Sequence, residues 1–94
     1  ADRIIKEAED NAKVIREKAA SSAETIRSEA DLRGKKLIKD AEASGPFAVA
    51  AAKKAAEALN READKRATQI VAEANKRADE VLATARTKAD EILR

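Results

Sequence analysis

The sequence lacks several residue types that catalysis and metal binding often use, above all Cys and His. Its 94 residues include no Cys, His, Trp, Tyr or Met and only one Phe. Without Cys there is no disulfide, thiolate nucleophile or Cys-based metal site, and the redox compartment stays open. Without His, the commonest general base and metal ligand is missing, and the serines have no imidazole to activate them. We therefore expect no enzyme activity, no cofactor, no metal site and no small-molecule substrate.

The given residues contain no pattern typical of a membrane span or of a signal peptide. No apolar run approaches the length that crosses a bilayer, and no basic region followed by an apolar stretch marks a signal peptide. The chain opens on Ala1 rather than Met, which predicts a processed or truncated piece and leaves an exported or cell-envelope location open. The net charge is only +2 and the signs alternate. A basic stripe with stacking aromatics is therefore lacking, and we expect no nucleic-acid partner.

Helix breakers are also scarce, with two Gly and one Pro. The chain instead contains 24 Ala against 17 larger apolar residues, and charged residues make up 40% of it. Ala, Glu, Lys, Leu and Arg in helical periodicity are typical of long helices and coiled coils. The composition therefore predicts an all-α fold.

An eleven-residue spacing organises the apolar positions. Ile70, Val81 and Ile92 are eleven apart, and so are Ile4, Ile15 and Ile26. Eleven residues make three turns at about 3.67 residues per turn, which predicts a nearly straight or right-handed coiled coil. These rows and their neighbours cover one arc of each helix. We expect the following residues at a helix–helix interface: Ile4, Ile5, Ala8, Ala12, Ile15, Ala19, Ala23, Ile26, Ala30, Leu37, Ile38, Ala41, Leu59, Ala63, Ala67, Ile70, Val71, Ala74, Ala78, Val81, Leu82, Ala85, Ala89, Ile92 and Leu93.

Polar residues and one glycine interrupt these rows. Arg16 and Arg27 share a row with Ile5 and Ile38, so this row is only half apolar. Gly34 stands in a row of alanines, where it predicts tight packing against another helix, with a hinge as the alternative.

The segment Ser44, Gly45, Pro46 is the one strong break. Gly suits a helix C-terminus, and Pro suits the first turn of the next helix. We predict a helix over 2–43, a turn at 44–46 and a helix over 47–93, in a single domain of residues 1–94. The fold expected is a two-helix antiparallel hairpin that dimerises into a four-helix bundle. The alternative is one long kinked helix in a parallel right-handed coiled coil, because the eleven-residue phase continues through the break.

Two further expectations concern the hairpin. Phe47, beside the turn, is expected to plug the open end between the helices. In an antiparallel hairpin, residues that lie level with each other have position numbers with a constant sum. The numbers of Ile4 and Ile92, and those of Leu37 and Leu59, both add up to 96. An antiparallel pairing at that sum would bring large apolar residues level across the hairpin.

The segments IIKEAEDNAKVIREKA and IVAEANKRADEVLATARTKADEIL resemble the eleven-residue-repeat stalks of rotary ATP synthases, namely the bacterial b subunit and its archaeal-type counterpart. That resemblance implies a long right-handed coiled coil that resists torque, although the Gly45–Pro46 break departs from an uninterrupted stalk. Late-embryogenesis-abundant proteins and apolipoprotein-like lipid-surface proteins carry similar repeats.

The leading hypothesis for function is a structural or assembly module acting through helix–helix self-association, with a homodimer favoured. The alternative is an amphipathic helix that binds membrane surfaces reversibly. Such helices usually carry a broader apolar face with bulky residues. Here the stripe is narrow and half of it is alanine, which favours helix partners.

Overall fold

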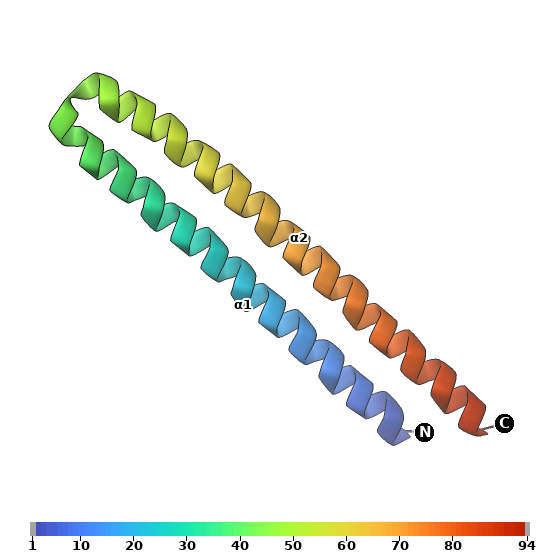
Figure 1. Cartoon of the computed structure of the whole chain (residues 1–94). Coiled ribbons are helices and arrows are strands. Elements are labelled where there is room, and N and C mark those ends of the chain that lie inside the picture. Colours follow the sequence, from blue (N-terminus) through green and yellow to red (C-terminus); the bar gives the residue numbers. More distant parts are fainter. Residues whose placement is uncertain (1, 94) are drawn as a thin grey trace. The chain divides into compact units, whose positions relative to one another are not determined.

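The computed structural model describes residues 2–93, which form two long α-helices joined by a short connection (Figure 1). Helix α1 spans Asp2–Ala41, a 3₁₀ turn η1 covers Glu42–Ser44, and helix α2 spans Pro46–Leu93. The expected all-α helical hairpin is confirmed. The first α-helix ends two residues earlier than expected because the chain tightens into η1, and Pro46 already belongs to α2.

Gly45 makes the change of direction between the helices. Its φ of 95° is the one positive φ among the described residues, and glycine adopts such a value without a steric penalty. The Gly45 N–H donates to the Glu42 carbonyl at 3.4 Å, which closes η1, while the Gly45 carbonyl accepts from the Val49 N–H at 3.1 Å. Pro46 fits the first position of α2, where a missing N–H costs nothing. Gly45 therefore ends the connection, and its carbonyl accepts a hydrogen bond from the first turn of α2, which begins at Pro46.

The helices form two compact units. The turn unit is Ser22–Gln69, and the terminal unit is the described part of Ala1–Ser21 and Ile70–Arg94. In each unit a segment of α1 lies beside an antiparallel segment of α2 (Figure 1).

Small residues line the contact between the helices. In the turn unit a Cβ added to Gly34 would lie 2.9 Å from the Cβ of Ala56, which is too close for real atoms. Ala23 and Ala67, eleven residues from these two, are 1% and 0% exposed. In the terminal unit Ala12 and Ala78 repeat the pattern, again with 1% and 0% exposure. The position numbers of each of these three pairs add up to 90, so the two members of each pair lie level with each other. Because these side chains are small, they set how closely the helices approach. Tight packing at Gly34 is confirmed.

Two expectations about the hairpin are wrong. Pairing at a sum of 96 is replaced by pairing near 90, because Gly34 lies against Ala56 and the midpoint of the hairpin falls on Gly45. The change of the sum from 96 to 90 corresponds to a shift of α2 along α1 of about 9 Å, at 1.5 Å per residue. The reason is that backbones approach most closely where side chains are smallest. Phe47 does not plug the hairpin either, since it lies at the second residue of α2 and is 93% exposed.

The Gly34–Ala56 contact predicts a compensating pair of substitutions. Gly34→Leu is expected to destabilise the protein by about 1–3 kcal/mol through overpacking. Gly34→Ala places a Cβ in the same crowded space, which offsets its gain of up to about 1 kcal/mol in helix propensity. Adding Ala56→Gly to Gly34→Ala removes the opposing Cβ, and chemical unfolding should show the two changes to be strongly non-additive.

A matched control uses Ala20→Leu, an exposed position of the same helix, for which a change of less than about 0.5 kcal/mol is expected. Equal stabilities for Gly34→Leu and Ala20→Leu would contradict the close contact.

Candidate helix–helix docking surface

The large apolar side chains lie beside the line of contact between the helices, not on it. The buried core among residues 2–93 consists of alanines together with Gly34, and no large side chain there is fully buried. Most of the Ile, Leu and Val residues of the apolar rows are half-buried, because the alanines hold the backbones close and push larger neighbours to the sides. The members of this half-buried set are Ile4, Ile5, Ile15, Ile26, Ile38, Val49, Leu59, Ile70, Val71, Val81 and Leu82.

One side of the turn unit carries a shallow groove, called here the turn groove. Its floor is apolar, formed by Ile26 and Ala30 of α1 with Leu59 and Ala63 of α2. Four charged side chains flank this floor, two from each helix: Glu29, Arg33, Glu62 and Arg66. Each helix therefore contributes one acidic and one basic residue, so the rim of the turn groove has no net charge.

The terminal unit carries a larger groove of the same kind, the terminal groove, with a volume of about 560 Å³. Ile4 and Ala8 of α1 and Val81 and Ala85 of α2 form its apolar floor. The polar side chains around it are Glu7, Asn11, Arg77, Glu80, Thr84 and Lys88. Both grooves thus combine an Ile/Leu/Val and Ala floor with charges of both signs at the edge.

In each unit, an ion pair crosses between the helices on the side away from that unit's groove. Arg27 donates from Nε to Oδ1 of Asp64 at 3.0 Å in the turn unit. Arg16 donates from its guanidinium to Oδ1 of Asp79 at 2.8 Å in the terminal unit. Successive residues of a helix are about 100° apart, so Ile26 faces the groove while Arg27 falls on the opposite side of the contact line. The two sides of each unit are therefore chemically different.

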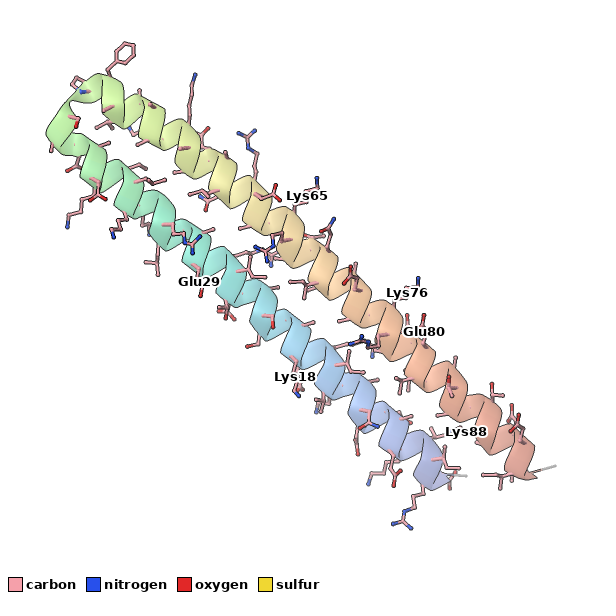
Figure 2. The ribbon with its side chains drawn as sticks, in the orientation of Figure 1. Lys18, Glu29, Lys65, Lys76, Glu80 and Lys88 are labelled. Atoms are coloured by element: carbon pink, nitrogen blue, oxygen red, sulfur yellow. The ribbon has the colours of Figure 1, made fainter. Side chains whose placement is uncertain are left out.

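Side chains far from the contact line are solvated. Figure 2 shows Lys18 pointing away from α2, and Lys65 and Lys76 pointing away from α1. Ion pairs four residues apart lie along α1, namely Arg3–Glu7 at 3.6 Å, Lys13–Glu17 at 3.9 Å and Lys35–Asp31 at 3.0 Å. Such exposed pairs contribute little to stability.

The expected interface residues fall into three groups. The structure buries the alanines Ala8, Ala12, Ala19, Ala23, Ala30, Ala63, Ala67, Ala78, Ala85 and Ala89. Besides the larger residues named above, Ala41 and Ala74 are half-buried. Leu37, Ile92 and Leu93 are exposed, at 40%, 63% and 75%. Ser44 and Pro46, expected in the turn, are exposed, and Gly45 is half-buried.

The ion pairs between the helices were missed by sequence reasoning. Arg16 and Arg27 stood out as polar residues in a half-apolar row, but nothing in the pattern identified Asp64 or Asp79 as their partners. Finding those partners requires the alignment of α1 with α2, and the alignment expected from the large apolar residues was wrong.

Residues 2–93 contain neither a candidate metal site nor a candidate membrane span. No group of three or more acidic side chains there is placed to hold a metal ion. Within the same range, neither helix contains a stretch apolar enough to cross a membrane. Comparison of the chain with known protein families, characterised proteins and solved structures finds no match.

The Arg27–Asp64 pair predicts a small, salt-dependent coupling. In a double-mutant cycle with Arg27→Ala and Asp64→Ala, the coupling should be about 0.2–1 kcal/mol, because both side chains are largely exposed. In 1 M salt it should nearly vanish, since the screening length falls to about 3 Å. Glu57, an exposed acid on α2 of the same unit, supplies the control, and its removal should be additive with Arg27→Ala. A coupling that salt leaves unchanged, or that equals the control, would argue against the pair.

Proposed function

We propose that this protein is a non-catalytic structural module that assembles by helix–helix self-association. The observation that carries the proposal is the half-buried state of its large apolar side chains. Burying one Val, Leu or Ile completely stabilises a protein by about 1.5–3 kcal/mol. A hairpin whose core is alanine leaves much of that stabilisation unused, and a second copy laid over the grooves would supply it.

The composition of the grooves supports a helical partner. Their floors are built from Ile, Leu, Val and Ala at helical spacing, the residue types that interdigitate when helices pack. The charged rims suit contact with a surface that is itself charged around an apolar centre. Two hairpins packed through these grooves make a four-helix bundle, and a homodimer is the simplest closed assembly.

The resemblance to rotary ATP synthase stalks remains a prediction, and it rests on the eleven-residue repeat. The eleven-residue spacing extends over both helices, and a right-handed supercoil in the assembly follows from that spacing. The reversal of direction at Gly45 departs from the uninterrupted helix of such a stalk. We therefore propose assembly by paired hairpins as the role of the repeat.

Light scattering tests the proposal directly. The mass in solution is expected to be twice the 10.1 kDa of one chain. Ile26→Asp should shift the mass toward one chain and lower helicity, because it places a charge on the apolar floor of the turn groove. Val14→Asp is the matched control, since Val14 is exposed and lines neither groove. A single-chain mass for the unchanged protein, or identical behaviour of the two variants, would refute self-association through the grooves.

Lipid vesicles separate this proposal from reversible membrane binding. A self-associating hairpin is helical without lipid, whereas an amphipathic surface helix gains helicity when lipid is added. We expect equal circular dichroism with and without mixed phosphatidylcholine and phosphatidylglycerol vesicles. A large gain in helicity on the vesicles would favour the membrane-surface function instead.

A further inference from the structure

We propose that the second copy docks face to face on the turn groove with its turn at the same end, so that in the turn unit α1 of one copy lies over α2 of the other. This inference rests on the proposed self-association and adds its geometry. In this arrangement the two-fold axis runs parallel to the helices. The turn groove then meets its own counterpart on the partner, and the alignment of the two copies there follows from the alignment of α1 with α2 within the turn unit.

The alignment within the hairpin can be read from its contacts. Gly34 and Ala56, which touch through the smallest side chains, have position numbers that sum to 90. The ion pairs between the helices are formed by longer side chains, and their position numbers have larger sums. The sum is 91 for Arg27–Asp64 and 95 for Arg16–Asp79. This increase has a physical reason. Side chains lean toward the N-terminus of their own helix, so long side chains on antiparallel helices meet when their residues lie closer to the two C-termini.

The same rule can be applied between copies. A charged residue on α1 should meet a charged residue of the partner's α2 when their numbers sum to between 91 and 95. In the turn groove this matches Glu29 with the partner's Arg66 and Arg33 with the partner's Glu62, both at 95. Glu29 points away from α2 of its own chain (Figure 2), which leaves it available to a partner. The symmetry repeats both contacts, so four ion pairs surround this apolar floor.

The terminal groove agrees with this assignment. Glu7 and the partner's Lys88, which both line it, also sum to 95. Among the charged residues lining the two grooves, four combinations of an α1 residue with a residue of the partner's α2 have sums between 91 and 95. Three have opposite signs, and the fourth, Glu29 with the partner's Glu62 at 91, has like signs. The charges therefore provide a check on the alignment that is independent of the apolar residues.

Exchange of charges tests this pairing. Glu29→Lys and Arg66→Glu should each weaken the homodimer about tenfold, because each turns two attractive contacts into repulsive ones. Mixed together, the two variants should form a heterodimer in preference to either homodimer. In that heterodimer the lysine introduced at position 29 of one chain meets the glutamate introduced at position 66 of the other, and the second pair is unchanged. Native mass spectrometry of the mixture counts the species. Glu24→Lys, an exposed change on α1 outside both grooves, should mix statistically with the unchanged chain.

Orientation is measured separately with one spin label. The chain has no Cys, so Ser44→Cys gives a unique attachment site beside the turn. With both turns at the same end, the two labels of a dimer should lie about 15–30 Å apart, given helix spacings of about 8–10 Å. With the turns at opposite ends and the turn grooves still facing each other, they would lie roughly 40–45 Å apart, at 1.5 Å per residue.

The outcomes separate the two proposals. A dimer that gives the short distance and the preferred heterodimer supports the docking geometry. A dimer that gives the long distance, or that mixes statistically, overturns the geometry but leaves self-association standing. A single-chain mass for the unchanged protein overturns both.

Discussion

The distance between the two helices depends on a line of side chains no larger than a methyl group. Gly34 against Ala56 leaves no space for another carbon atom, and the neighbouring alanines along the contact line are almost completely buried. Close approach gives many weak dispersion contacts between backbones, each about 0.1–0.2 kcal/mol. It also removes room for any larger residue at the centre, and this steric limit decides where the remaining apolar residues lie.

Displacement of the larger residues gives each hairpin unit two unlike sides. On one side, Ile26 and Leu59 form an apolar floor with mixed charges at its rim. On the other, Arg27 and Asp64 are joined by an ion pair whose partners are largely exposed. A protein with a core of Leu and Ile between its helices would satisfy most of its apolar surface internally. Here the core is too thin for that, and the larger apolar side chains beside it stay half-buried.

Much of the fold could be predicted from sequence. The helical periodicity and the single Gly45–Pro46 break are local signals, and both identify the hairpin correctly. The structure buries the alanines of the expected interface rows from Ala8 to Ala30 and most of those from Ala63 to Ala89, whereas Leu37, Ile92 and Leu93 are exposed. The alignment of one helix against the other could not be predicted, because every eleven-residue row offers matches at some alignment. Which row lies at the centre depends on the competition between close backbone packing and burial of large side chains, and Gly34 was the one residue that indicated the result.

The positions of the ion pairs along the hairpin also imply an order of folding. Arg27 and Asp64 are 37 residues apart in sequence, whereas Arg16 and Asp79 are 63 apart. Closing the longer loop in an unfolded chain costs about 0.5 kcal/mol more, and the contacts nearest Gly45 close the shortest loops of all. Folding is therefore expected to begin beside the turn and to proceed toward the ends of the helices, with each contact shortening the loop that the next one must close. Opening should begin at the opposite end, where α1 starts and α2 finishes, so exchange of backbone amide protons should be fastest there.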